Sequence, residues 1–202
     1  GKSFIGAAVL KHFAVTEGAK PLIICPASLV PMWERYNAKY SLSAQVVSMG
    51  LLVESDNDGN LLLDDDRYSD RTFVLVDESH NFRNPNAQRY GSLELILEAN
   101  GGRGRDGARK KVILLTATPI NNDIFDLYNQ ISLITQGDLS HFTACGIGDL
   151  RKYFRRARRQ SSNGEGVFAL FNLLEETVIR RTRPFIRAAY PEATIHGRRI
   201  TF

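Results

Sequence analysis

Short, unbroken runs of apolar residues alternate along the first two-thirds of the chain with segments whose apolar side chains recur at helical spacing. The unbroken apolar runs lie at residues 21–25, 73–76 and 112–115, and residues 44–49 look like another strand. Runs of this length predict strands that are buried on both faces, as in a parallel sheet covered by helices. The helical segments lie at residues 4–15, 28–40, 86–98 and 124–131. This alternation predicts an α/β fold, a three-layer αβα sandwich with a mostly parallel sheet.

The pattern changes after residue 137. Two helical segments rich in arginine follow, at residues 149–160 and 168–190, and a turn-forming stretch of serine, asparagine and glycine separates them. The second segment keeps an amphipathic period, as expected of a helix with one buried face. We therefore expect an α/β domain at residues 1–137 and a helical, arginine-rich subdomain at residues 138–202.

Some single positions within these segments have a predicted structural role. Ser28 and the run Asn121-Asn122-Asp123 precede predicted helices, and their side-chain oxygens are suited to capping the first turn. Trp33, Tyr90 and Tyr128 lie on predicted helices among other apolar residues, so we expect them to pack in the core.

Polar residues gather where the predicted strands end. Asp77 and Glu78 directly follow the apolar run at residues 73–76, and Thr116 and Thr118 follow the run at residues 112–115. Open α/β sheets place their ligands at the carboxyl ends of the strands. Two adjacent carboxylates are costly to bury without a cation or hydrogen-bond donors beside them. The pattern therefore predicts a site for a metal ion and a nucleotide.

The tripeptide Gly1-Lys2-Ser3 opens the first predicted helix and matches the end of the phosphate-binding loop GxxxxGK[ST]. In such a loop the lysine reaches the β- and γ-phosphates, and the serine hydroxyl binds Mg²⁺. The tripeptide alone is a weak signal. It gains weight because the fold predicts that it faces the same crevice as Asp77 and Thr116.

Composition restricts the class of protein. The chain has 202 residues, of which 43% are hydrophobic and 24% charged, and this suits one domain with an appended subdomain. No apolar run approaches the roughly 18 residues of a membrane helix, and the first residues do not resemble a secretory signal. Cys25 and Cys145 are far apart and form no CxxC pair. We expect no membrane span, no disulfide and no structural metal.

Charge is unevenly distributed along the chain. Residues 141–202 hold 12 Lys and Arg against 5 Asp and Glu, whereas the net charge of the whole chain is +4. This asymmetry is typical of a protein that binds a polyanion near that end, and equally of a solvated helical face. Charge alone leaves both alternatives open.

Several motifs together resemble those of a known family. Residues 77–80 (Asp-Glu-Ser-His) and 115–119 (Leu-Thr-Ala-Thr-Pro) look like motifs II and III of superfamily 2 helicase-like ATPases. Residues 24–33 resemble motif Ia of the SWI/SNF branch, and residues 178–183 resemble that branch's basic segment between its two motor lobes. The resemblance covers nearly the whole chain in the expected order. It implies the first RecA-like lobe of a DNA-dependent ATPase, which moves on duplex DNA and remodels bound proteins without separating the strands.

The resemblance also implies roles for individual residues. ATP and Mg²⁺ would be held by Gly1, Lys2 and Ser3, with Lys2 on the β/γ-phosphates and Ser3 and Asp77 on the Mg²⁺. Glu78 would orient and deprotonate the attacking water. Residues that would couple the nucleotide state to the DNA surface are His80, Thr116, Ala117 and Thr118. Residues expected at the phosphate backbone of double-stranded DNA, bound independently of sequence, are Ser28, Arg151, Arg155, Arg156, Arg180 and Arg181.

Two of these DNA assignments have a simpler alternative. The arginines at 151–159 could serve only to keep a helix solvated. Arg180 and Arg181 could pair with Glu175 and Glu176, and each such exposed pair would contribute only about 0 to 1 kcal/mol.

The resemblance further implies parts that the 202 residues do not include. We expect the chain to be truncated at both ends, without the start of the phosphate-binding loop and without the second RecA-like lobe of the same protein, which would be a partner. Negligible ATPase activity is expected of the chain alone. The source is expected to be a prokaryote, with the protein in the cytoplasm, or in the nucleus if the source is a eukaryote.

Two other functions are compatible with parts of the sequence. A degenerate lobe could act as a nucleic-acid-binding scaffold, although Lys2, Asp77 and Glu78 are all competent residues. Another P-loop enzyme, such as a nucleotide kinase, would leave the motif at 115–119 and the arginine-rich segments unexplained.

Overall fold

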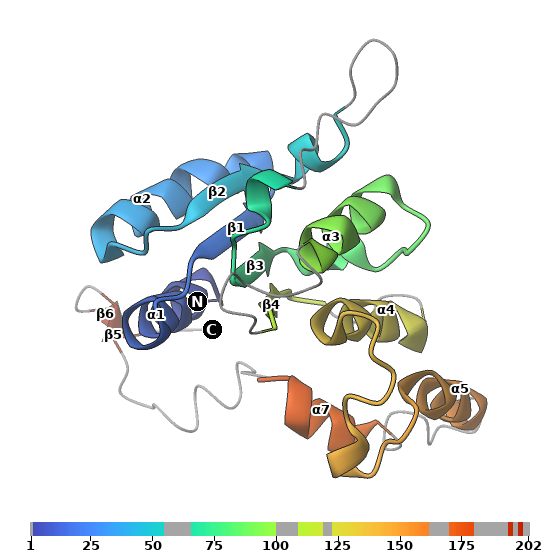
Figure 1. Cartoon of the computed structure of the whole chain (residues 1–202). Coiled ribbons are helices and arrows are strands. Elements are labelled where there is room, and N and C mark those ends of the chain that lie inside the picture. Colours follow the sequence, from blue (N-terminus) through green and yellow to red (C-terminus); the bar gives the residue numbers. More distant parts are fainter. Residues whose placement is uncertain are drawn as a thin grey trace.

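A parallel four-stranded sheet forms the centre of the computed structural model (Figure 1). The structure describes residues 2–54, 66–99, 109–118, 123–161, 170–179, 194–195 and 198–199. The strands are β1 (Pro21–Cys25), β2 (Gln45–Ser48), β3 (Phe73–Asp77) and β4 (Lys111–Leu115). Their order is β2-β1-β3-β4, and every pair is parallel. The parallel sheet and its four predicted strands are confirmed.

The two inner strands are the most apolar because helices cover both of their faces. Every residue of β1 and β3 is buried, whereas β4 is only partly buried. The register pairs Ile24 with Val76 and Asp77 with Leu115. The carboxyl ends of β1, β3 and β4 therefore meet at one edge of the sheet.

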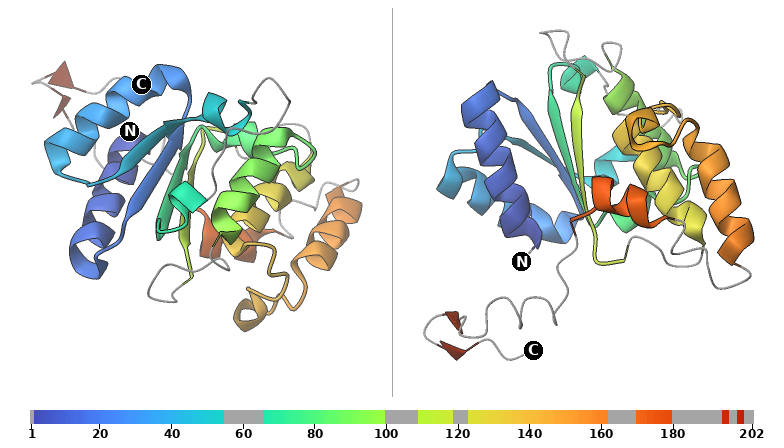
Figure 2. Two further views of the ribbon diagram at one scale, coloured as in Figure 1. Left: turned by 45° about the horizontal axis from the view of Figure 1, so that its top comes forward. Right: turned by 90° about the horizontal axis from the view of Figure 1, so that it is seen from below.

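Helices α1 (Lys2–Glu17) and α2 (Val30–Tyr40) cover one face of the sheet, and α3 (Gln88–Glu98) and α4 (Ile124–Thr135) cover the other (Figure 2). Strand side chains alternate between the two faces, so each face has its own core. Ile23 and Leu75 pack with Trp33 beneath α1 and α2, while Val74 and Val76 pack toward α3. The predicted three-layer αβα sandwich is confirmed.

Gly6 allows α1 to approach the sheet closely. A Cβ atom at this position would lie 2.9 Å from methyl carbons of Leu75 and Leu115, and 3.3 Å from the Trp33 ring. A side chain here would have to displace these buried groups, so glycine fixes the depth at which α1 packs.

The segment after α4 builds a second core on the outer side of that helix. It contains α5 (Leu150–Ser161), α7 (Phe171–Thr177) and the 3₁₀ turn η5 (Thr143–Cys145). The cluster that joins these elements consists of Ile124, Leu127, Ile131, Phe142, Ile147, Leu150, Phe154, Ala157, Leu170 and Leu173. The predicted arginine-rich helix at 149–160 is confirmed. The second predicted helix is described only over α7, and the division of the chain at residue 137 stays a prediction.

The remaining elements are short. They are the 3₁₀ turns η1 (Ala27–Leu29), η2 (Met49–Leu52), η3 (Asp66–Tyr68) and η4 (Ser79–Phe82), and the strands β5 (Thr194–Ile195) and β6 (Arg198–Arg199). The two short strands pair with each other and are antiparallel. No helix in the described ranges has the length and apolar character needed to cross a membrane.

One predicted helix cap is confirmed and the other is wrong. Asp123 caps α4 and forms a reciprocal capping box with Asp126. Ser28, in contrast, lies in η1, and the residue that precedes the first turn of α2 is Leu29. The reason is that Ser28 already belongs to a 3₁₀ turn, whereas an N-cap residue has a non-helical backbone.

Candidate active site

The first turn of α1 meets the carboxyl end of β3, although the two segments are far apart in the sequence. Lys2 Nζ lies 3.2 Å from Glu78 Oε1, and Ser3 Oγ donates a hydrogen bond of 3.2 Å to Asp77 Oδ2. The two pairs are separated by 76 and 74 sequence positions. The fold thus brings together Lys2, Ser3, Asp77 and Glu78, as the motifs predicted.

Asp77 is a buried carboxylate with three hydrogen-bond donors. Its exposed fraction is 1%. Oδ2 accepts from Ser3 Oγ and from Trp33 Nε1, which lies 3.0 Å away. Oδ1 accepts from the Glu78 backbone N–H at 2.9 Å. These donors compensate the loss of water around the carboxylate and fix its orientation.

The sequence interpretation gave Trp33 a packing role only, and that role is confirmed because Trp33 is fully buried. Its hydrogen bond to Asp77 was missed. A buried indole N–H group usually finds an acceptor, and this rule was the available signal. Trp33 therefore contributes to the site as well as to the core.

Glu78 projects from a left-handed backbone conformation. Its φ angle is 50°, and Asn81 Nδ2 donates to its carbonyl oxygen at 2.8 Å. Residues other than glycine adopt this conformation at a cost of roughly 1–2 kcal/mol. The turn directs the Glu78 side chain toward Lys2 on one side and His80 on the other. His80 Nδ1 lies 3.2 Å from Glu78 Oε2. This contact is not a hydrogen bond, and the buried Nδ1 atom has no other hydrogen-bond partner among the described residues.

The loop after β3 is attached to α4 through side chains that the motifs did not single out. Ser79 Oγ donates to Gln130 Oε1 at 3.0 Å, and both residues are buried. Asn129 Nδ2 donates to the Arg83 carbonyl at 2.7 Å. The geometry of the loop that carries Glu78 and His80 thus depends on α4. The only available signal for Gln130 was its position among apolar residues on a predicted helix, where a glutamine side chain would be buried.

The residues that follow β4 and β1 lie at the same edge of the sheet. Thr116 accepts a hydrogen bond of 3.1 Å from the Thr118 backbone N–H, and Ala117 and Thr118 are exposed. Ser28 is also exposed, in the turn after β1. Among the residues that the structure describes, no hydrogen bond joins this group to His80.

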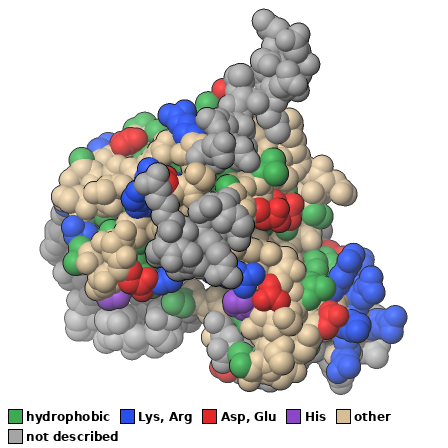
Figure 3. Space-filling view, viewed as in Figure 1, with side chains coloured by type: hydrophobic (Ala, Val, Ile, Leu, Met, Phe, Trp, Pro, Cys, Tyr) green, Lys and Arg blue, Asp and Glu red, His purple; other side chains and the backbone are tan. Residues whose placement is uncertain are grey.

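The predicted DNA-binding arginines on α5 lie apart from the site. Arg151, Arg155 and Arg156 are exposed on that helix. Figure 3 shows Lys and Arg side chains gathered over the same part of the molecule. Gly1, Arg180 and Arg181 fall outside the described residues, so their predicted roles have no structural counterpart here.

Cys25 ends β1 beside the site and remains a protonated thiol. Burial, then the negative charges of Asp77 and Glu34, raise its pKa to about 12. Cys25 and the exposed Cys145 are both free thiols.

The oxygen atoms of Ser3 and Asp77 fit a magnesium ion that arrives with a nucleotide. A hydroxyl and a carboxylate oxygen lie 3.2 Å apart at the start of a helix, and Mg²⁺ prefers one or two protein oxygens together with phosphates and waters. Within the described part of the chain, no three His, Cys, Asp or Glu side chains gather to hold a metal ion by themselves.

No protein-family model matches the chain. The chain is 26% identical to the uncharacterized ATP-dependent helicase YqhH of Bacillus subtilis, over 91% of this chain and 31% of that protein. It is 25% identical to the helicase swr1 of Emericella nidulans, over 95% of this chain and 13% of that protein. It is 23% identical to the SWI/SNF-related matrix-associated actin-dependent regulator of chromatin subfamily A containing DEAD/H box 1 of Xenopus tropicalis. This match covers 83% of this chain and 18% of that protein. The chain thus spans less than a third of these relatives, and the predicted resemblance to SWI/SNF-type helicases is confirmed.

A solved structure shares the fold. The Sulfolobus solfataricus SWI2/SNF2 ATPase core in complex with dsDNA superposes with a TM-score of 0.62 at 18% identity, covering 91% of this chain and 38% of that one. The predicted RecA-like α/β fold is therefore confirmed.

Proposed function

We propose that the chain is the first motor lobe of an ATP-dependent translocase or remodeller that acts on duplex DNA. The observation that carries this proposal is the pairing of Lys2 with Glu78 and of Ser3 with Asp77 at the start of α1. The similarity to helicases of the SWI/SNF type supports it.

On this proposal, ATP binding exchanges the partner of Lys2. The Lys2 ammonium now pairs with Glu78 and would turn to the β/γ-phosphates, where the N-terminus of α1 also favours negative charge. Glu78 Oε1 is thereby released, and its carboxylate can accept a proton from the attacking water. The ion pair therefore keeps the general base paired with Lys2 until a nucleotide binds.

Asp77 and Ser3 would hold Mg²⁺ at the same edge. The bound ion supplies positive charge that offsets the charge developing on the phosphoryl oxygens. The Asp77 carboxylate can take this role without a large movement, because Trp33 and the Glu78 backbone N–H already fix its orientation.

Duplex DNA is the proposed track. Ser28 and the exposed residues Ala117 and Thr118 lie on the edge that carries the carboxylates, so phosphate contacts there would be close to the proposed hydrolytic site. The solved relative is described in complex with dsDNA, which supports this choice of ligand. Contacts to phosphate position a protein without reading sequence, so we expect binding that weakens steeply with salt.

We also propose that turnover requires a second RecA-like lobe. The chain spans 31% of one curated relative and less of the others, which leaves room for such a lobe. In related phosphoryl-transfer systems an arginine supplied by a partner is worth about 10³ to 10⁵ in rate. We therefore expect negligible ATPase activity from these 202 residues alone, measured with and without duplex DNA.

The test of the proposed function is Glu78→Gln in a protein that contains this chain and the second lobe. Loss of the general base should lower the ATP turnover rate by about 10² to 10⁴, while DNA binding is retained. The matched control is Glu98→Gln at the end of α3, an exposed carboxylate near the opposite edge of the sheet. Equal turnover in Glu78→Gln and wild type would contradict the motor and favour the scaffold alternative.

A further inference from the structure

The turn that follows β3 sets the direction of the Glu78 side chain, and its backbone is strained at that residue. Glu78 has the left-handed φ angle of 50°, and the chain enters the 3₁₀ turn η4 directly after it. A residue other than glycine keeps such a conformation only where its surroundings impose it. The bond from Asn81 Nδ2 to the Glu78 carbonyl oxygen lies within the turn and moves with it. Bonds to other elements are therefore needed to hold the turn in place.

Two neighbouring residues of α4 provide such bonds. At the start of the turn, Ser79 Oγ donates to Gln130 Oε1 at 3.0 Å. Just past the end of the turn, Asn129 Nδ2 donates to the Arg83 carbonyl oxygen at 2.7 Å. Ser79 directly follows Glu78, so the bond to Gln130 is the one that acts closest to the proposed general base.

Gln130 is oriented for this bond by its own helix. Its Nε2 atom donates to the Asp126 carbonyl oxygen, one turn earlier in α4, at 3.2 Å. An amide group has one donating and one accepting end, so this bond leaves Oε1 directed at the Ser79 hydroxyl. Gln130 is buried, as are its helix neighbours Leu127 and Ile131. An apolar side chain would fill the same position without the cost of burying an amide, which indicates a role beyond packing.

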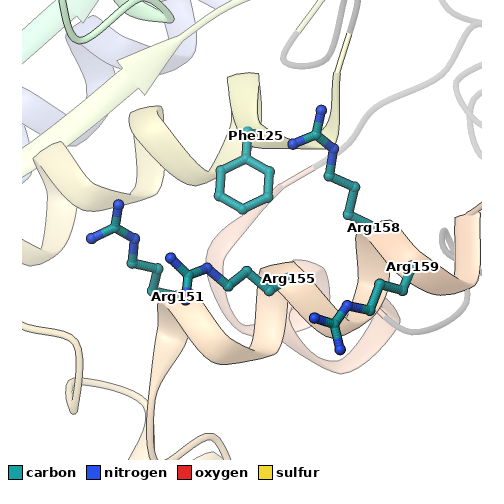
Figure 4. A pocket seen from close by; sticks show the side chains of 5 residues that line it. All are labelled: Phe125, Arg151, Arg155, Arg158 and Arg159. Atoms are coloured by element: carbon teal, nitrogen blue, oxygen red, sulfur yellow. The ribbon is translucent and has the colours of Figure 1, made fainter.

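Helix α4 is held in place from its other side by α5. Leu127 of α4 and Phe154 of α5 belong to one core. Arg158 of α5 lies 2.7 Å from Asp123, at the start of α4, and its guanidinium lies 5.4 Å from the centre of the Phe125 ring. Figure 4 shows this ring projecting from α4 toward the arginines of α5. These contacts fix α4 independently of the turn after β3, so α4 can serve as its support.

We infer that Gln130 is a positioning residue for the general base of the ATPase. Through the Ser79 hydroxyl it holds the turn in the conformation that directs the Glu78 carboxylate toward the start of α1. This inference rests on the proposed function, because it requires Glu78 to be the general base. Loss of the bond should leave ATP binding intact and slow the chemical step, since a small displacement of a catalytic group can lower the rate by about 10²-fold.

The test is the steady-state ATPase rate of Gln130→Leu in a protein that contains this chain and the second lobe, with duplex DNA at saturation. Leucine suits a buried position in a helix and cannot accept a hydrogen bond. We expect kcat to fall by about 10- to 100-fold at an unchanged KM for ATP. Ser79→Ala removes the donor of the same bond and should give a similar loss. The double variant should be no slower than either single variant, because both substitutions act through one bond.

Stability separates a positioning role from a structural one. The double variant removes the donor and the acceptor of the bond together, so its urea midpoint should stay close to that of wild type while its kcat stays low. The control is Thr135→Val, which replaces another buried polar side chain at the last residue of α4. The Thr135 hydroxyl donates to the Ser132 carbonyl oxygen of the same helix. Thr135→Val should therefore keep the wild-type kcat, whatever its effect on the urea midpoint.

Several results would overturn the inference, and they are distinguishable from failure of the proposed function. Wild-type kcat in Gln130→Leu, together with lost turnover in Glu78→Gln, would reject the positioning role and leave the motor intact. Ser79→Ala decides the same question if Gln130→Leu does not fold. A loss of kcat that Thr135→Val reproduces would assign Gln130 to the stability of α4 alone. Wild-type turnover in Glu78→Gln would reject both the positioning role and the proposed function.

Discussion

At the scale of single residues, the orientation of Asp77 depends on three donors that come from three separate segments. The Ser3 hydroxyl comes from α1, the Trp33 indole from α2 and the Glu78 backbone N–H from the turn after β3. Two of these donors share one oxygen. Loss of either would leave the carboxylate buried and only partly compensated.

The substitution Trp33→Phe separates the hydrogen bond of Trp33 from its packing. We expect it to lower the free energy of unfolding by about 2–4 kcal/mol, since a hydrogen bond to a charged group contributes about 1.5–3 kcal/mol and the smaller ring leaves a void. Urea denaturation measures this change. Tyr36→Phe, on the same helix and in edge-to-face contact with Trp33, is the control and should cost about 0.5 kcal/mol or less. Equal costs for the two variants would show that the indole donor contributes nothing.

The two cysteines should differ in reactivity because the buried Cys25 thiol stays protonated, whereas Cys145 is exposed to reagents. Burial and the neighbouring carboxylates keep the pKa of Cys25 at about 12, and Cys145 is exposed. At pH 8 we expect one thiol to react with Ellman's reagent in the native protein and two in denaturant. Cys145→Ser should abolish the native reaction. Rapid labelling of Cys25 in folded Cys145→Ser would contradict this assignment.

At the scale of elements, two glycines inside helices have opposite roles. Gly91 lies in α3 with open space where a Cβ atom would stand, whereas Gly6 in α1 lies against Leu75 and Leu115. A glycine inside a helix costs about 1 kcal/mol relative to alanine, so the environment decides whether replacement helps.

The matched substitutions are Gly91→Ala and Gly6→Ala. Gly91→Ala should raise the free energy of unfolding by about 1 kcal/mol through helix propensity alone. Gly6→Ala should lower it by about 1 kcal/mol, because forcing a methyl group into a packed core costs about 1–3 kcal/mol. Thermal or urea unfolding of the two variants side by side provides the measurement. A gain in stability for Gly6→Ala would mean that α1 can move away from the sheet without cost.

The sequence predicted helices and strands well where a single force dominates. The short apolar runs of β1 and β3 favour buried parallel strands over any other structure. Asp123 caps α4 through its side-chain oxygen, as predicted. Ser28 was misassigned because the capping rule considers the residue type, whereas the backbone at Ser28 already forms part of the 3₁₀ turn before α2.

At the scale of the whole molecule, the pattern of strands and helices predicted the layers but not the cross-layer contacts. Strand polarity placed Asp77 and the first turn of α1 at one edge of the sheet, which is why Lys2 and Ser3 were expected there. The bond from Trp33 and the attachment of Ser79 to Gln130 depend on the exact packing of α2 and α4. Helical spacing identifies a buried face, but it does not identify the polar atom that a buried side chain will meet.

The whole molecule also contains two cores that share one helix. Leu133 of α4 packs in the core of the sheet, while Leu127 and Ile131 pack against α5 and its neighbours. Helix α4 additionally carries Gln130, which holds the loop beside Glu78. Any movement of α5 therefore acts on a helix that is bonded to the loop after β3.

If the chain has the proposed function, the hydrogen bond between Trp33 and Asp77 has a thermodynamic consequence. Helix α2 starts one residue after Leu29, next to the turn that would touch DNA, and Trp33 on its first turn bonds the carboxylate that would hold the ion. If duplex binding shifts α2, it alters the affinity of the site for nucleotide. Linkage is reciprocal, so nucleotide must then change the affinity for the duplex by the same factor. A single indole hydrogen bond would in this way couple the affinity for duplex DNA to the occupancy of the nucleotide site.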